Sequence, residues 1–384
     1  MEIYFDNSAT TKVIEPVVEI VSDMMSRDFG NPSAMHTKGF EAEKYIKDAK
    51  QTIAEILKVQ EKEILFTSGG TESNNLAIIG TAFANKRKGN HIITSSIEHA
   101  SIYQPMKFLE EQGFRITYLP VDGNGIVSLD ALRDAICEET ILVSIMHVNN
   151  EIGAVEPIRE IANIVKEKNP ETYVHIDSIQ GFGKYRIYPK RWGIDLLSVS
   201  GHKIHGPKGV GFLFIKDKTK IHPLILGGGQ QGGMRSGTEN VPGIAGIAVA
   251  AKEAYNHFEE NINQMIRCKN RLIQGLRKLE DVQINSKEGE EGAPHIVSAS
   301  FAKIRSEVLL HALEEQHIYV SAGSACSSNH PSVSKTLQAI GMKKELLDCT
   351  LRFSFSAFNT EKEVDDCLAV LESLLKRLRL YTRK

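Results

Sequence analysis

Short apolar runs alternate with amphipathic helical patterns through the first two thirds of the chain. The apolar runs predict strands at residues 64–67, 91–95, 116–120, 141–146, 173–176, 195–199 and 210–215. Between them, segments such as Ile158–Lys168 carry the apolar spacing of a helix. This alternation predicts an α/β fold in which helices cover both faces of a mostly parallel sheet. In such sheets, ligands bind in the loops that follow the carboxyl ends of the strands.

The pattern changes near Ala251. A long polar stretch, 251–279, predicts one connecting helix. It is followed by a charged loop at 287–292, further strands, a loop at 321–334 and an amphipathic helix from Thr360 to about Leu380. We interpret this part as a second, smaller α/β domain.

The composition narrows the function classes. The 384 residues are 41% hydrophobic and 24% charged, with a formal net charge of −2. This balance favours neither nucleic acid nor a membrane surface as a partner. The first residues have no basic start followed by an apolar stretch, so we expect no signal peptide. Of the five cysteines, no two form a CxxC pair, which indicates reduced thiols in a cytoplasmic protein rather than disulfides or a metal site.

The segment 67–75, TSGGTESNN, follows a predicted strand and opens a predicted helix. Glycines such as Gly70 let the backbone approach an anion closely, and the first turn of a helix offers unpaired N–H groups. The segment therefore fits a phosphate cradle with the Thr71 hydroxyl as an added donor. A plain strand-to-helix turn with Thr71 as the N-cap explains the same pattern equally well.

Charged and polar residues also stand at the ends of two later predicted strands. Asp177 ends one strand and could face a cationic ring nitrogen, although a strand-end Asp more commonly caps the next turn. Ser200, His202 and Lys203 follow another strand in a glycine-bearing loop. A lysine in that position can form a Schiff base while its neighbours hold phosphate. The alternative is a basic surface loop, but the three segments together supply phosphate donors, a partner for a ring nitrogen and a partner for an aldehyde.

For three further segments, the residues alone allow two interpretations each. The glycine-rich range 227–238 is either a flexible linker or a loop that brings Thr238 to a phosphate. His99, just after a strand, either caps a helix or stacks on a cofactor ring and moves protons. Cys326 lies among small, polar, turn-forming residues at 321–331, whereas the other four cysteines fit buried positions or a helix face. We therefore favour Cys326 as a functional thiol.

Taken together, these segments resemble the cysteine desulfurases, the NifS/IscS-like branch of the class V aminotransferase group. The resemblance runs nearly end to end. Besides the segments above, it is carried by FDNSATT at 5–11, GNPS at 30–33, NNEIG at 149–153 and RFS at 352–354. Departures are modest: Ser8 stands where Asn or Ala is expected, Gly70 stands where many members have Ala, and the sequence ends without the longer tail of some members.

The resemblance implies a homodimeric enzyme that uses pyridoxal 5′-phosphate (PLP), with the cofactor in a fold type I architecture. It implies a seven-stranded large domain, 15–255, and a small domain formed by 1–14 and 256–384. The implied cofactor-binding residues are Gly70, Thr71, His99, Asn150, Asp177, Gln180, Ser200, His202, Lys203 and, from the partner subunit, Thr238. Lys203 would carry the cofactor, and Asp177 and Gln180 would face its ring nitrogen and its phenolic oxygen.

For the reaction, the resemblance implies that Asn150 and Arg352 grip the carboxylate of L-cysteine. Lys203, His99 and Cys326 would be catalytic, with Cys326 receiving the sulfur as a persulfide and passing it to an acceptor protein. That acceptor would serve iron–sulfur clusters, thiolated tRNA or a cofactor. The alternatives are a selenocysteine lyase, another class V PLP enzyme, or a sulfur-assembly adaptor that has lost catalysis.

Overall fold

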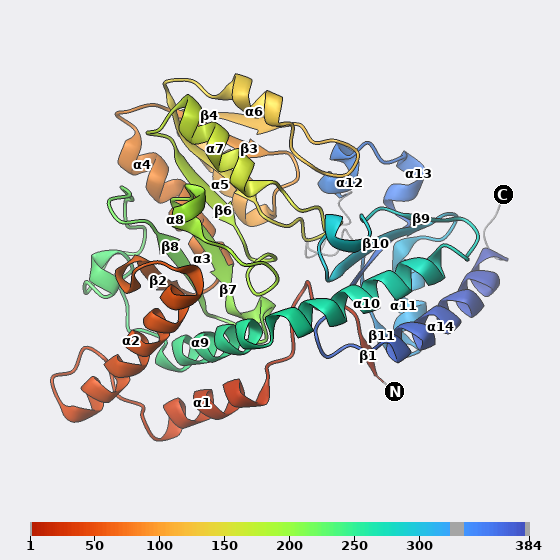
Figure 1. Ribbon diagram of the computed structural model, residues 1–384, viewed down its shortest axis with the longest axis horizontal. Helices are drawn as coiled ribbons and strands as arrows, with labels where there is room; N and C mark the ends of the chain where they lie inside the picture. The colour runs from red at the N-terminus through yellow and green to blue at the C-terminus, as the bar shows by residue number, and fades with distance from the viewer. Residues whose placement is uncertain (1, 323–333, 381–384) are drawn as a thin grey trace.

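The computed structural model describes residues 2–322 and 334–380. A seven-stranded sheet forms the centre of its larger part (Figure 1). The strand order is β2-β8-β7-β6-β5-β3-β4, and only β8 is antiparallel to its neighbours. In that order, the strands are Ile64–Thr67, Gly211–Ile215, Leu196–Ser200, Tyr173–Asp177, Thr140–Met146, His91–Ser95 and Arg115–Leu119. The predicted mostly parallel sheet is confirmed, and each predicted strand end agrees to within one residue.

Helices cover both faces of this sheet, as the sequence predicts. Alternate strand residues point to opposite faces, so Leu197 packs toward one layer of helices and its neighbour Leu196 toward the other. The first layer contains α1 (Glu15–Ser26), α2 (Thr37–Leu57), α6 (Leu129–Ala135), α7 (Ile158–Lys168) and α9 (Val241–Asn256). The second contains α3 (Gly70–Asn75), a π-helical turn (Leu76–Gly80), α4 (Thr81–Asn85) and α5 (Ala100–Glu111). The short α8 (Pro189–Trp192) precedes β7.

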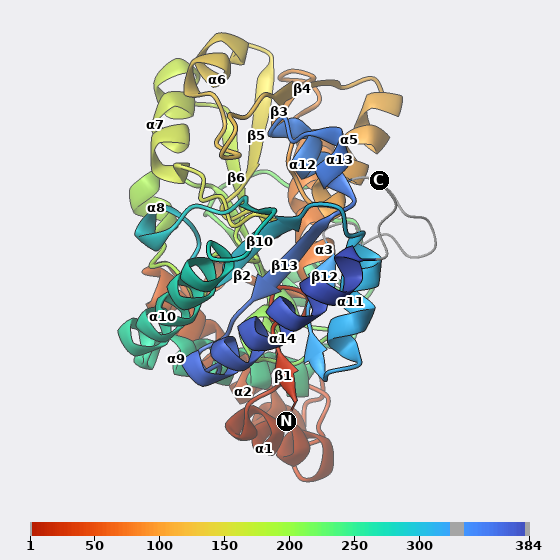
Figure 2. The same ribbon diagram turned by 90° about the vertical axis from the view of Figure 1, so that its right-hand side faces the viewer.

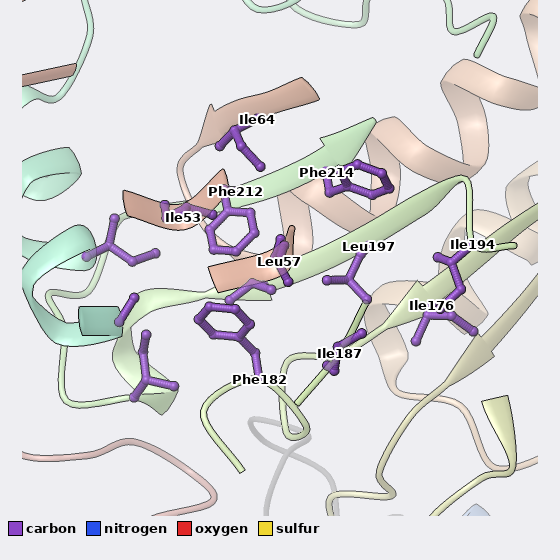
Figure 3. Packing of buried hydrophobic residues seen from close by; sticks show 14 of the residues in the cluster. Ile53, Leu57, Ile64, Ile176, Phe182, Ile187, Ile194, Leu197, Phe212 and Phe214 are labelled. Carbon is purple, nitrogen blue, oxygen red and sulfur yellow. The ribbon is translucent and has the colours of Figure 1, made fainter. Parts of the chain in front are cut away.

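The core of the first layer fixes the turn that follows β6. Ile53 and Leu57 of α2 lie in the same cluster as Phe212 of β8 (Figure 3). Phe182, fully buried, packs edge to face on Phe212 with 5.3 Å between ring centroids. Such aromatic pairs add about 0.5–1.5 kcal/mol beyond burial. Since Phe182 lies just after the turn at 177–181, this packing holds that turn against the sheet.

The predicted single helix at 251–279 is wrong. The chain forms two helices, α9 and α10 (Phe258–Leu276), with His257 between them in a non-helical conformation. The rings of Tyr255 and Phe258 stack across the break at 5.5 Å. No proline or glycine marks this position, so no helix-breaking residue in the sequence signals the interruption. Figure 1 shows α9 along the larger sheet and α10 running on into the smaller part.

The smaller part joins both ends of the described chain (Figure 2). An antiparallel sheet in the order β12-β13-β10-β9 packs against α10, α11 and α14. The N-terminal strand β1 pairs in parallel with β11, and Phe5 packs on Phe355 in the same core. The elements are β1 (Ile3–Tyr4), β9 (Val282–Ile284), β10 (Ile296–Phe301), α11 (Ser306–Glu314), β11 (Ile318–Tyr319), β12 (Ser321–Ala322), α12 (Lys335–Ala339), α13 (Lys344–Leu347), β13 (Thr350–Ser354) and α14 (Glu361–Arg379). The predicted terminal helix is confirmed. Among the described helices, none combines the length and apolarity needed to cross a membrane.

Candidate active site

Loops after five strands converge on one cavity of about 330 Å³. Strands β2, β3, β5, β6 and β7 point their carboxyl ends toward the same edge of the sheet, where ligands bind in such folds. The smaller part adds one residue from β13. The lining includes ten of the twelve residues expected from the sequence, namely Gly70, Thr71, His99, Asn150, Asp177, Gln180, Ser200, His202, Lys203 and Arg352.

Lys203 lies in a short 3₁₀ turn directly after β7 and is half-buried. Its Nζ donates hydrogen bonds to the carbonyl oxygens of Ser8 and Ala9, at 2.5 and 2.8 Å. The N-terminal segment therefore closes over the lysine. The alternative of a basic surface loop is wrong for Lys203, because its amine is held inside the cavity wall.

Asp177 ends β6 at the bottom of the cavity and is buried. Its Oδ1 accepts the backbone N–H of Ile179 at 3.0 Å, and its Oδ2 accepts from Asn74 Nδ2 at 2.9 Å. The first bond is the turn cap that the simpler interpretation predicted, so Asp177 caps a turn and also faces the cavity. Burial raises the pKa of this carboxyl, while His99 and Lys203 oppose the rise. A cation placed beside Asp177 would stabilise its charged form.

His99 also combines the two roles that the sequence left open. It is the N-cap of α5, where Nδ1 accepts the backbone N–H of Ser101 at 3.1 Å. It lines the cavity as well. Burial lowers the pKa of the imidazole. With Nδ1 occupied as an acceptor, the neutral ring carries its proton on Nε2.

The end of the cavity next to β2 is formed by the glycine-bearing start of α3. Gly69 is the N-cap of α3 with φ of +149°, a conformation that favours glycine. Thr71 is therefore not the N-cap, and its exposed side chain faces the cavity. A Cβ on Gly70 would meet Ile179 Cδ1 at 2.2 Å, so the backbone fits closely between Ile179 and Ser200. A second hollow of about 400 Å³ opens beside it, toward Lys208.

Arg352 enters the cavity from β13 and is 3% exposed. Its Nη2 forms an ion pair with Asp6 Oδ1 at 2.7 Å, and its Nη1 donates to the Asn150 carbonyl at 2.9 Å. These contacts join the smaller part, the N-terminal segment and the loop after β5. They hold the guanidinium in one orientation. Its Nε is buried and has no hydrogen-bond partner among the described residues.

Of the two other expected residues, Thr238 is described and Cys326 is not. Thr238 is exposed and does not line the cavity. Its segment is tied down rather than a free linker, because Arg235 Nε pairs with Glu72 Oε1 at 2.9 Å. Cys326 lies outside the described residues. Around the rest of the described chain, no cluster of three or more His, Cys, Asp or Glu residues is arranged to hold a metal.

The expectation for the remaining cysteines needs one correction. Cys268, Cys349 and Cys367 are buried, as predicted, but Cys137 is exposed in the turn after α6. Its slight burial acts to raise the pKa of the thiol, yet hydrogen bonds from Thr140 and Arg115 bring that pKa below its usual value. Cys137 is therefore not an inert core residue.

Sequence reasoning missed the residues that hold the cavity wall in place. Asp6 and Ser8 orient Arg352 and Lys203, and Asn74 orients Asp177. All three lie inside segments quoted for the resemblance, so their presence there was the available signal. Glu98 was also missed. It lies half-buried next to His99, its Oε1 accepts from Ser95 and the Met146 N–H, and burial raises the pKa of the carboxyl to about 8.

Comparison with known proteins agrees with this geometry. The family model described as aminotransferase class-V matches residues 3–367. "Cysteine desulfurase IscS" of Methanosarcina thermophila is 45% identical over 98% of this chain and 93% of its own length. A solved "NifS-like protein" superposes with a TM-score of 0.93 at 38% identity, covering 98% of this chain and all of the other. A structure titled "SspA in complex with cysteine" gives 0.81 at 35%, covering 94% of this chain and 100% of that one. This chain therefore belongs to the class-V aminotransferase family, in its cysteine desulfurase group.

Proposed function

We propose that this protein is a PLP-dependent cysteine desulfurase that converts L-cysteine to L-alanine and forms a persulfide on Cys326. One observation carries the proposal: a lysine, a buried carboxylate and a buried arginine meet in one cavity at the carboxyl edge of the sheet. The relatives named cysteine desulfurase, and the solved relative whose title names cysteine, support the choice of substrate.

The residues present fit PLP. Among the described residues, Ser8 Oγ and Arg352 Nε are buried without a hydrogen-bond partner, and both residues line the cavity. Asp177 is a buried carboxylate whose direct hydrogen bonds come from neutral donors only. Buried polar atoms without partners are disfavoured, so a ligand that brings a cation, a phosphate and a carboxylate into this cavity would satisfy them.

PLP, when bound, supplies an aldehyde that bonds to amines and a pyridine ring that accepts electrons from the substrate Cα. Lys203 Nζ would bond to the aldehyde, and Asp177 would keep the ring nitrogen protonated. Thr71, Ser200 and His202 would hold the phosphate, next to the unpaired N–H groups at the start of α3. Gln180 and His99 would contact the phenolic oxygen and the ring face.

The substrate is oriented by its carboxylate. Arg352, already fixed by Asp6, offers a planar guanidinium that suits bidentate binding of a carboxylate. Asn150 lines the same wall and would support it. Lys203 Nζ, at the same wall of the cavity, would be the base that removes the Cα proton of the substrate.

Cys326 completes the reaction as the nucleophile. Its thiolate attacks the sulfur of the bound cysteine, so that a new S–S bond forms and the Cβ–S bond breaks with its electron pair left on carbon. That carbon takes up a proton, Lys203 would return a proton to Cα, and alanine is released. The persulfide then passes to a sulfur-acceptor protein for iron–sulfur clusters, thiolated tRNA or another cofactor.

The proposal includes a homodimer of two-domain subunits. The large domain would span 15–255, and the small domain would combine 1–14 with 256–384. Separate core clusters support this division, since Ile3 and Phe5 pack with residues after 264 rather than with the large sheet. Exposed apolar side chains on and after α1, including Met25, Phe29 and Met35, support a partner surface.

The direct test uses the purified protein reconstituted with PLP. Wild type should show a visible absorbance band and release equal amounts of alanine and persulfide sulfur from L-cysteine in the presence of a thiol acceptor. Lys203→Ala should lose the band after dialysis and form no alanine, because no other described lysine lines this cavity. A wild-type protein that binds PLP but returns no alanine would refute the proposal.

A further inference from the structure

A buried histidine contacts a residue that lines the active-site cavity. His295, directly before β10, is 1% exposed. Its Nε2 lies 3.2 Å from Oε1 of Gln180, which lines the cavity after β6. His295 itself does not line that cavity. The smaller part of the molecule therefore reaches the site at a second place besides Arg352.

The orientation of the Gln180 amide follows from its other neighbour. Gln180 Nε2 lies 2.9 Å from the Ser8 carbonyl oxygen, and a carbonyl can only accept. The amide nitrogen must therefore face Ser8, which leaves Oε1 facing His295. An amide oxygen also only accepts, so Nε2 of His295 must carry the proton in this contact.

The surroundings of His295 keep the ring neutral. Burial lowers the pKa of the imidazole well below its usual value, and Lys184, Lys269, Arg352 and Lys203 all act in the same direction. A neutral ring carries one proton, so Nδ1 is bare. Nδ1 is indeed buried without a hydrogen-bond partner among the described residues. The ring is thus a donor with one tautomer, and its single N–H is directed at Gln180.

We propose that His295 is a positioning residue. By donating to Oε1, it holds the Gln180 amide in one orientation, in which the N–H that is not bonded to Ser8 points into the cavity. This assignment rests on the proposed function, in which the phenolic oxygen of PLP accepts this N–H. Without His295, Oε1 of Gln180 becomes a buried acceptor without a partner, and the side chain turns to satisfy it. The phenolic oxygen then loses its donor.

This role predicts a spectroscopic change that general destabilisation would not produce. A donor on the phenolic oxygen stabilises its negative charge and weakens the internal hydrogen bond from the protonated Lys203–cofactor linkage. Loss of the donor strengthens that internal bond, so the pKa of the linkage rises. We expect His295→Leu to raise it by about one pH unit.

The experiment compares four PLP-loaded proteins by titrating their visible absorbance against pH. His295→Gln retains an N–H donor at similar reach and should titrate like wild type. His91→Leu is the matched control, because His91 is equally buried and its ring contacts Thr117, Thr140 and Cys137 at the amino end of β3, away from the cavity lining. It should lose stability without a shift. Equal titration of wild type and His295→Leu would overturn the inference.

A second measurement works without cofactor. Ring ¹⁵N chemical shifts of His295 in the cofactor-free wild type should report a neutral ring that is protonated on Nε2 at neutral pH. A proton on Nδ1, or a charged ring near pH 6, would overturn the inference even if His295→Leu failed to fold. A wild type with no visible band would instead refute the proposed function, which separates the two failures.

Discussion

At the scale of single residues, the chemistry-bearing groups could be identified from sequence and their supports could not. Lys203, Asp177 and Arg352 stand at the ends of strands or in recognisable segments, so their positions predicted one site. His295 and Asn74 act only through contacts between distant parts of the chain, with Gln180 and Asp177. Asn74 lies inside the segment 67–75 quoted for the resemblance, but no local pattern there or around His295 shows which distant residue each one contacts.

Arg352 is the residue whose removal should separate substrate binding from turnover. Arg352→Ala loses a bidentate, charge-assisted contact of about 1.5–3 kcal/mol, which corresponds to a roughly ten- to hundredfold higher KM for cysteine. Arg352→Lys keeps the charge without the planar fork and should lie between. Arg352→Ala should also lower stability, because Asp6 loses its partner. Titration of substrate binding with unchanged affinity in Arg352→Ala would remove this residue from the site.

Cys137 should react with alkylating reagents although it takes no part in catalysis. Its pKa is lowered, whereas burial raises the pKa of Cys268 to about 11 and of Cys367 to about 12. At neutral pH, Cys137 therefore has the larger thiolate fraction and should be modified first among these three. Peptide mass mapping after brief alkylation checks the order. Cys137→Ala should keep full alanine production, and a loss of activity would contradict this assignment.

At the scale of elements, periodicity located most strands and helices but not every break. The helix at 158–168 and the strands at 64–67 and 91–95 match their predictions in full. The break at His257 escaped prediction because neither glycine nor proline marks it and the helical pattern continues on both sides. Such a break depends on tertiary packing, here Tyr255 against Phe182 and Arg186 over the ring of Phe258.

The start of α14 gives a direct test of one element. Thr360 Oγ1 accepts the Glu363 N–H at 3.2 Å, and Glu363 Oε2 accepts the Thr360 N–H at 2.7 Å, which together form a capping box. Thr360→Ala should lower the free energy of unfolding by about 1 kcal/mol, and Thr360→Ser should retain most of it. Urea denaturation measures both. Equal stability of the alanine variant and wild type would show that the cap does not hold this helix.

At the scale of the whole molecule, both chain ends return to one small sheet and core, and from there Arg352 and His295 reach the site on the large sheet. Sequence patterns predicted two units, but their contacts at the cavity required the structure. Thr238 is the expected residue that one chain does not bring to its own cavity. Our account assigns it to the cavity of a partner copy.

A mixing experiment tests that assignment. Lys203→Ala lacks the cofactor lysine, and Thr238→Glu would place a negative charge beside the partner's phosphate, so each homodimer should be inactive. Random hybrids, about half of all dimers, contain one site with both defects and one intact site. Co-expression should therefore restore about a quarter of wild-type alanine production. No recovery, or a monomeric mass in sedimentation with full activity, would rule out a shared site.

The most direct test of the central claim is the fate of substrate sulfur. Wild type is exposed briefly to L-cysteine, and peptide mass mapping locates the persulfide while alanine is quantified in parallel with Cys326→Ser. We expect the persulfide on Cys326 alone, and we expect the serine variant to bind PLP and cysteine without forming alanine, because a serine hydroxyl is a far poorer nucleophile than a thiolate at neutral pH. A persulfide on any other cysteine, or wild-type turnover by Cys326→Ser, would contradict the account.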